Sequence, residues 1–129
     1  MTVLAIDHIQ IAMPEGKEDL ARDFYSKVLG IPEVGKPLHL VKRGGVWFER
    51  GSLKVHLGID PDFVPAKKAH PGLLVADLNE LSEKLKSHGY VVSDGSSLPG
   101  FRRIFTNDPF GNRIEFLQAI TAFQAKYVD

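Results

Sequence analysis

Three histidines and one glutamate are the residues of this sequence best suited to chemistry: His8, His56, His70 and Glu115. Imidazole nitrogen and carboxylate oxygen together form a normal ligand set for Zn²⁺, Fe²⁺, Ni²⁺ or Mn²⁺. Ligands that come from separate rigid strands leave positions on the metal open for water or substrate, as a catalytic metal requires. The sequence therefore predicts one divalent metal ion per site, with His56 as a fourth ligand, a base or a substrate contact.

The spacing of these four residues indicates an internal repeat. The interval from His8 to His70 nearly equals the interval from His56 to Glu115. In the predicted strands each of the four lies on the face opposite the apolar residues that pack against a helix. A single histidine in a strand is more often a hydrogen-bonded structural residue than a ligand. Four polar residues at matching positions are harder to explain separately, whereas His39 and His88 have no repeat partner and receive no role.

The elements that position these residues occur in the same order in both halves of the chain. The first half predicts a strand at 4–13, a helix at 17–28, and strands at 34–41, 46–50 and 53–59. The second half predicts a strand at 70–76, a helix from the N-cap Asp77 to Gly89, and strands at 90–93, 102–106 and 113–117. The tail, 119–129, is compatible with a short helix. The order βαβββ, repeated, predicts an α+β fold whose two sheets curl around a shared cleft.

The strand that carries Glu115 follows a strong turn signal, Asp108-Pro109-Phe110-Gly111-Asn112. Proline fixes φ, whereas glycine and asparagine tolerate positive φ. A carboxylate in the middle of the next strand is costly to bury without a cation or a hydrogen-bond donor. Taken alone, Glu115 could pair with Arg113 or with an arginine of a neighbouring strand, and the metal is the alternative that the repeat favours.

Composition limits the class of protein. The 129 residues fit a single domain with a real core, with a first module at about 4–60 and a second at about 69–118. Sixteen basic and sixteen acidic residues balance, which gives no indication of a nucleic acid or an anionic membrane as partner. Cysteine is absent, which excludes disulfides and thiolate chemistry. We expect no signal peptide and no membrane span, and therefore a cytoplasmic protein.

Several short motifs, in this order, resemble the vicinal oxygen chelate superfamily, also called the glyoxalase/bleomycin resistance/dioxygenase superfamily. The first half contributes Asp7-His8-Ile9-Gln10-Ile11, Phe24-Tyr25 and Leu29-Gly30-Ile31. The second half contributes Ala69-His70, Leu85-Lys86, Gly89-Tyr90, the turn 108–112 and Ile114-Glu115-Phe116. The resemblance covers about residues 4–118. It implies two βαβββ modules, metal ligands at His8, His56, His70 and Glu115, and a homodimer with sites built from both chains.

The resemblance also implies a shared chemistry, in which a substrate chelates the metal through adjacent oxygens and the metal stabilises developing negative charge. Glyoxalase I-like enzymes of bacteria usually carry a carboxylate at the position of His56, so this sequence departs from their pattern. Glu115 is then the acidic ligand able to move a proton. Fosfomycin-resistance-like and extradiol dioxygenase-like members use a set that His8, His70 and Glu115 would satisfy.

Two functions from different classes compete. One is a metal-dependent enzyme of the lyase/isomerase, thiol transferase or dioxygenase type, with Glu115 and His56 as catalytic residues and a small molecule as substrate. The alternative is a metal-free drug-binding protein resembling the bleomycin-resistance branch. The candidate substrate contacts are Trp47 for an aromatic group and the arginines Arg102 and Arg103 for an anionic group. The complete ligand set favours the enzyme.

Overall fold

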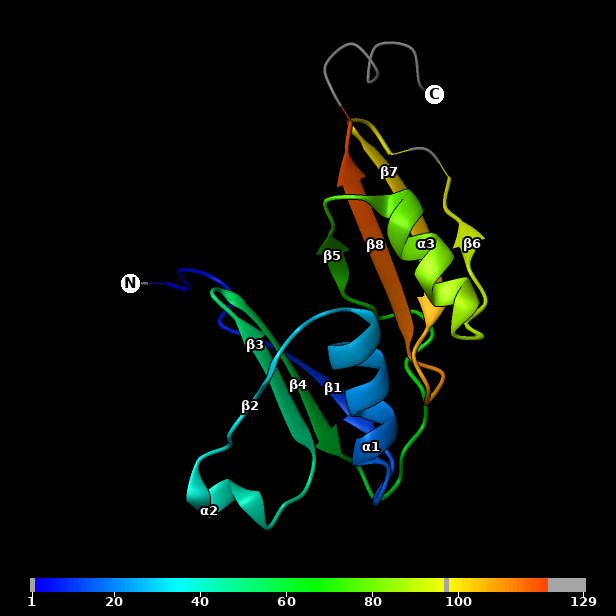
Figure 1. The fold of residues 1–129 in the computed structure, drawn as a ribbon. Coiled ribbons are helices and arrows are strands. Elements are labelled where there is room, and N and C mark those ends of the chain that lie inside the picture. Colours follow the sequence, from blue (N-terminus) through cyan, green and yellow to red (C-terminus); the bar gives the residue numbers. More distant parts are fainter. Residues whose placement is uncertain (1, 97, 121–129) are drawn as a thin grey trace. The chain divides into compact units, whose positions relative to one another are not determined.

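The structure of the chain is a computed structural model that describes residues 2–96 and 98–120. The chain divides into two compact units at the boundary between Pro65 and Ala66. Each unit contains one four-stranded sheet and its own helix, coloured blue to green in the first unit and green to red in the second (Figure 1). Because the two units have the same order of elements, the predicted α+β fold of two βαβββ modules is confirmed. No helix among the described residues has both the length and the apolar character needed to cross a membrane.

The sheet of the first unit has the strand order β1-β4-β3-β2. Its elements are β1 (Ile9–Met13), α1 (Glu18–Ala21), β2 (Glu33–Val34), α2 (Leu38–Val41), β3 (Val46–Arg50) and β4 (Leu53–Ile59). Strand β1 pairs with β4 in parallel, and the other pairs are antiparallel. Helix α1 continues directly into π-helical turns at Arg22–Val28, which end before Gly30 at a positive φ of 76°.

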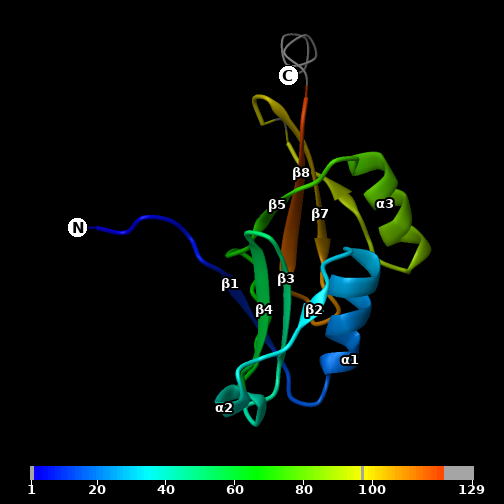
Figure 2. The same cartoon turned by 60° about the vertical axis from the view of Figure 1, so that its left-hand side comes forward.

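The sheet of the second unit repeats this pattern with the order β5-β8-β7-β6. Its elements are β5 (Gly72–Leu74), α3 (Leu78–Ser87), β6 (Ser93–Asp94), β7 (Phe101–Asn107) and β8 (Arg113–Ala119). Strand β5 pairs with β8 in parallel, and α3 lies along one face of β7 and β8 (Figure 2). The predicted cap is confirmed, because the Asp77 carboxylate accepts a hydrogen bond from the backbone N–H of Glu80 at 3.0 Å.

Each sheet buries apolar side chains on the face toward its helix. In the first unit, Met13, Phe48 and Val55 are fully buried with Phe24 and Tyr25 of the helix. In the second, the buried side chains include Ile104, Ile114, Phe116, Leu78 and Leu85. This arrangement follows from strand periodicity, because alternate side chains of one strand point to opposite faces. The opposite face of each sheet is therefore the one that carries polar residues.

Four expectations about boundaries differ from the structure, one of them being the strand predicted at 90–93, where β6 contains only Ser93 and Asp94. The predicted strand at 34–41 is wrong, since β2 contains only Glu33 and Val34 and residues 38–41 form the helical turn α2. Pro37 explains the difference, because it cannot donate to a sheet and it begins the turn with its carbonyl accepting from Leu40 N–H at 2.8 Å. The strands predicted at 4–13 and 70–76 are shorter, so His8 and His70 precede β1 and β5. The helix predicted in the tail falls almost wholly on 121–129, outside the described residues.

Candidate functional site

Backbone register places the four predicted residues at two pairs of equivalent positions. Gln10 of β1 pairs with His56, and Gly72 of β5 pairs with Glu115. His8 precedes Gln10 by two residues, and His70 precedes Gly72 by two. Each unit by itself therefore combines one residue from before its parallel edge strand with one residue of the central strand β4 or β8.

In the first unit, His56 is part of an aromatic stack. Its ring lies 3.8 Å from the Trp47 ring, centroid to centroid, with only 2° between the two planes. The ring of His8 also stacks on the ring of His56, with 4.6 Å between the centroids and 21° between the planes. Trp47 lies directly across from His56 because the two residues pair in register on β3 and β4. His56 is 4% exposed, so this stack fixes the plane of a buried imidazole.

A carboxylate that the sequence analysis missed completes this group. Nε2 of His56 lies 2.7 Å from Oε2 of Glu49, whose side chain is 26% exposed. A neutral imidazole that carries its proton on Nε2 satisfies this contact by donating to the carboxylate. The signal was present in the sequence: Gly51 and Ser52 make a two-residue turn, and the resulting hairpin register puts Glu49 diagonally beside His56.

Of the two predicted site residues in the first unit, His8 is the exposed one. Its side chain is 41% exposed, and its Nδ1 lies 3.0 Å from Oδ2 of Asp7. The hydrogen bond from His8, followed by the neighbouring ammonium of Lys54, lowers the pKa of the Asp7 carboxyl below its ordinary value. A carboxylate that accepts from Nδ1 leaves Nε2 of a neutral His8 with its lone pair, as is typical of a histidine that binds a metal through Nε2.

In the second unit, His70 and Glu115 bring two potential ligand atoms together. Nε2 of His70 lies 2.8 Å from Oε1 of Glu115, and Nδ1 of His70 lies 2.9 Å from the carbonyl oxygen of Lys68. A carbonyl oxygen only accepts, so Nδ1 carries a proton and a neutral ring presents a lone pair to Glu115. An ionised carboxylate also presents lone pairs. These two atoms repel unless a proton or a cation lies between them.

Arg103 holds the other oxygen of Glu115. Its Nη1 lies 3.5 Å from Oε2 of Glu115, while Nε and Nη2 donate to the carbonyl and hydroxyl oxygens of Ser96, each at 2.9 Å. Glu115 is 7% exposed, so a nearby guanidinium offsets part of the cost of burying its charge. Gly95 makes room for this arginine, because a Cβ at position 95 would lie 2.7 Å from Cγ of Arg103.

The turn before β8 sets the position of Glu115. Oδ1 of Asp108 accepts from the backbone N–H groups of Phe110 and Asn112, both at 2.9 Å. Oδ1 of Asn112 in turn accepts from the backbone N–H of Ala66 at 2.9 Å. Asp108 and Asn112 are buried, so the turn is a rigid start for the strand.

Of the two arginines predicted to contact substrate, the structure brings only Arg103 to Glu115. Arg102 points to the helix side of β7, where its Nη2 donates to Oδ1 of Asn79 at 3.0 Å. The two residues are adjacent in a strand, and alternation sends them to opposite faces. The shared role predicted for the two arginines did not take this alternation into account. Trp47, the third predicted substrate contact, stacks on His56 and also lines a cavity of the first unit.

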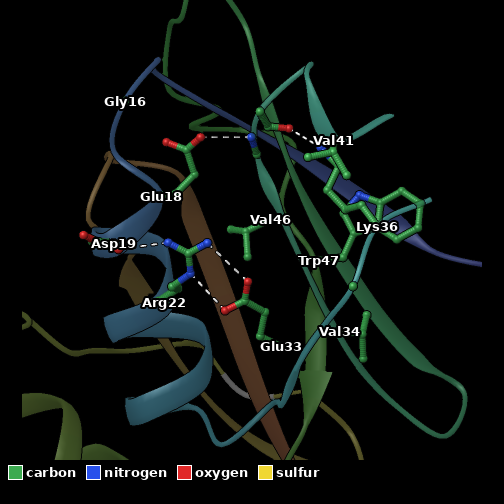
Figure 3. A pocket seen from close by; sticks show the side chains of 13 residues that line it. Gly16, Glu18, Asp19, Arg22, Glu33, Val34, Lys36, Val41, Val46 and Trp47 are labelled. Atoms are coloured by element: carbon green, nitrogen blue, oxygen red, sulfur yellow. Dashed lines mark hydrogen bonds and ion pairs between the residues drawn. The ribbon is translucent and has the colours of Figure 1, made fainter. Parts of the chain in front are cut away.

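A cavity of about 460 Å³ in the first unit lies between α1, β2 and the segment that contains α2 (Figure 3). The charged groups on its wall are already paired. Arg22 bonds Asp19 and both oxygens of Glu33, and Glu18 accepts from the backbone N–H of Gly45. Lys36 donates to the carbonyl of Gly44. These contacts fasten the α2 segment to α1, and we assign the cavity a structural role.

The donor set fits the divalent metal predicted from the sequence only in part. Among residues 2–96 and 98–120, no three His, Cys, Asp or Glu side chains gather as a metal would require. Each unit brings two of the predicted residues together. His70 and Glu115 fit two adjacent ligands of one ion, because a separation of 2.8 Å suits a nitrogen and an oxygen that bind the same metal side by side. His56 fits less well as a ligand, because its Nε2 is already directed at Glu49.

Comparisons with known proteins agree with this architecture. The family model described as Glyoxalase/Bleomycin resistance protein/Dioxygenase superfamily matches residues 5–116. The crystal structure of a glyoxalase family protein from Bacillus anthracis is 42% identical in sequence, with a TM-score of 0.88 over 93% of this chain and 98% of that chain. A search of curated proteins gives no match.

Two more distant structures share the fold. A fosfomycin resistance protein from Listeria monocytogenes is 13% identical, with a TM-score of 0.72 over 96% of this chain and 99% of its own. A lactoylglutathione lyase from Agrobacterium tumefaciens is 20% identical, with a TM-score of 0.69 over 91% of this chain and 95% of its own. The family model and the Bacillus anthracis protein together show that this chain belongs to the glyoxalase/bleomycin resistance protein/dioxygenase superfamily.

Proposed function

We propose that the protein is a metal-dependent enzyme acting on a small substrate that chelates the metal through adjacent oxygens. The observation that carries this proposal is the 2.8 Å contact between Nε2 of His70 and Oε1 of Glu115. Because the carbonyl of Lys68 accepts from the other ring nitrogen, this contact needs a proton or a cation between its two atoms. A divalent ion satisfies both lone pairs at once.

His70, Glu115 and His8 are the proposed metal ligands, each of the histidines binding through Nε2. The metal, when bound, supplies a Lewis acid that stabilises negative charge on the substrate oxygens. Metal identity follows supply and geometry, so nickel, zinc, manganese and iron all fit this nitrogen and oxygen set. Arg103 contributes by holding the second oxygen of Glu115, which directs the first oxygen toward His70.

His56 and Glu49 are proposed to move protons rather than to bind the metal. The carboxylate fixes the tautomer of the imidazole, and the stack on Trp47 fixes its plane. A histidine that is oriented by a carboxylate is a common general base or acid. Glu49 is then a second carboxylate able to accept a proton, in addition to Glu115. This division of roles fits lyase or isomerase chemistry, in which a proton leaves one carbon or oxygen and returns to another.

The test is the metal content of protein purified without a histidine tag. We expect about one divalent ion per chain by elemental analysis, lost in His70→Ala and retained in His88→Ala. His88 is a matched control because it lies at the end of α3, where its Nδ1 contacts the carbonyl of Lys84 and the hydroxyl of Ser87 in the same helix. Protein that stays free of metal after incubation with Ni²⁺, Mn²⁺, Fe²⁺ and Zn²⁺ would overturn the proposal in favour of a metal-free binding protein.

The same purified protein tests the proposed assembly. We propose a homodimer in solution, and light scattering coupled to size exclusion measures the mass directly. A mass of one 14.3 kDa chain at working concentration would contradict it.

A further inference from the structure

A cavity of about 330 Å³ lies beside His70 on the sheet face of the second unit. Its wall is formed by residues of β6, β7, β8 and the segment before β5: Lys68, His70, Ser93, Asp94, Gly95, Ser96, Arg103, Phe105 and Arg113. A neighbouring cavity of about 400 Å³ shares Ser93, Phe105 and Arg113 with it. The volume is sufficient for a small polar group next to the proposed metal ligands.

The charges on this wall are predominantly positive. Three basic side chains, Lys68, Arg103 and Arg113, face one acidic side chain, Asp94. Asp94 also lines a cavity on the other side of β7, beside Arg102. The second cavity adds Lys67 and no acidic residue. A concave surface with this balance attracts an anion.

Arg103 and Arg113 differ in whether their N–H donors are already paired. Arg103 already donates to both oxygens of Ser96 and contacts Glu115. Arg113 instead lies over the Phe105 ring, with its guanidinium carbon 4.1 Å from the ring centroid. Within residues 2–96 and 98–120, no carboxylate or carbonyl oxygen accepts from the Arg113 side chain.

Packing on an aromatic ring holds a guanidinium in place without using its N–H donors. A half-buried guanidinium with free donors is well suited to bidentate recognition of an oxyanion. Phe105 orders the site further, because His70 meets the same ring edge to face at 5.6 Å. Phe105 thus sets Arg113 and His70 at a fixed separation.

We propose that the cavity beside His70 binds an oxyanion group of the substrate, such as a phosphate, phosphonate or carboxylate, and that Arg113 is the residue that binds it. Lys68 contributes a second positive charge at the rim. The inference rests on the proposed function in one respect, namely that the substrate reacts next to His70 and Glu115. It names the substrate class as small anionic molecules, and it places the recognition on Arg113 rather than on Arg102.

The experiment is a titration of the whole, metal-free protein with inorganic phosphate, followed by ¹H–¹⁵N NMR. Removing metal with a chelator ensures that the anion cannot bind through a metal ion. We expect chemical shift changes at Ser93, Gly95 and Arg113, and an affinity lowered about tenfold or more in Arg113→Gln. Arg102→Gln removes the same charge from the opposite face of the sheet and should leave the affinity unchanged. Methylphosphonate and acetate, at equal ionic strength, then rank the oxyanion types.

Equal weakening by both arginine variants, or shifts confined to other parts of the protein, would overturn the inference. Lys68→Gln changes an exposed side chain and provides a second test should Arg113→Gln fold poorly, with a severalfold loss of affinity expected. The outcome is independent of metal. Phosphate binding without any metal binding would support the oxyanion site and refute the proposed metal-dependent enzyme. Metal binding with no role for Arg113 and Lys68 would refute the oxyanion site and support the metal-dependent enzyme.

Discussion

The central strands of the two units carry different chemistry at the same backbone position. His56 of β4 and Glu115 of β8 each pair with the residue two places after His8 or His70. An aromatic residue lies directly across from each, Trp47 in one unit and Phe105 in the other. The tryptophan stacks flat on an imidazole, whereas the phenylalanine packs against guanidinium groups and meets an imidazole in a T-shaped arrangement.

The difference lies in whether the polar atoms of each unit satisfy one another. In the first unit, a neutral His56 donates a single N–H to Glu49, and this hydrogen bond pairs both groups. In the second, both ring nitrogens of His70 face acceptors, so one more proton or a cation is required. A repeat thus keeps the positions of side chains while the chemistry at those positions diverges. We infer that His70 and Glu115 of the second unit bind the cation, together with His8, whereas His56 and Glu49 of the first unit handle protons.

Replacing Glu115 or Glu49 by glutamine should give the largest difference between the two units. Glu115→Gln is expected to lower the affinity for a divalent metal by at least about 100-fold, because it removes a ligand. Glu49→Gln makes the same chemical change in the first unit and should leave metal affinity within a few-fold of the parent. Competition against a fluorescent chelator measures both. An equal loss in the two variants would mean that Glu49 is also a ligand and that the two units are not specialised.

Removing the imidazole of His56 or of His8 should have a smaller effect, on stability. His56→Ala leaves Glu49 without its partner and Trp47 without its stack, and should lower the free energy of unfolding by about 3 kcal/mol. His8→Ala removes a side chain that is 41% exposed and should cost less than about 1 kcal/mol. Chemical denaturation with a common m-value provides both numbers.

His56→Phe sharpens that prediction, since it keeps an aromatic ring against Trp47 and removes only the hydrogen bond. Its cost should fall between those of His56→Ala and His8→Ala. A cost equal to that of His56→Ala would show that the contact with Glu49 provides all of the stabilisation and the stack none.

Much of the fold follows from local signals that tertiary structure did not override. Asp77 caps α3 as its residue type and position predict, and the repeated order of elements identifies the two modules. The equivalence of His8 with His70 was predicted from spacing, and the register of β1 on β4 and of β5 on β8 agrees with it. The strand predicted at 34–41 was wrong, and the single Pro37 decides the outcome.

Contacts between strands were harder to predict than positions along them. The partnership of His56 with Glu49 depends on hairpin register, which the turn at Gly51-Ser52 sets. The separation of Arg102 from Arg103 depends on the alternation of a strand whose bounds had to be known to one residue. Arg113 was noticed only as a partner for Glu115, because its stacking on Phe105 requires the two strands to be aligned.

The smallest expected effect concerns the group that accepts a hydrogen bond from Nδ1, which differs between His8 and His70. For His70 that group is a carbonyl, which does not titrate, whereas for His8 it is the carboxylate of Asp7. Since the pKa of Asp7 is lowered in the folded protein, its ionised form favours folding above the unfolded value of about 3.9. That contribution is lost as pH falls through the folded pKa, and it is small because the group is fully exposed. An NMR titration of the Asp7 carboxyl should show its pKa rising in His8→Ala and also in Lys54→Ala, since the His8 hydrogen bond and the Lys54 ammonium both lower it. An unchanged pKa in His8→Ala would show that Asp7 does not hold His8, and it would remove the reason to expect Nε2 of His8 as the ligand atom.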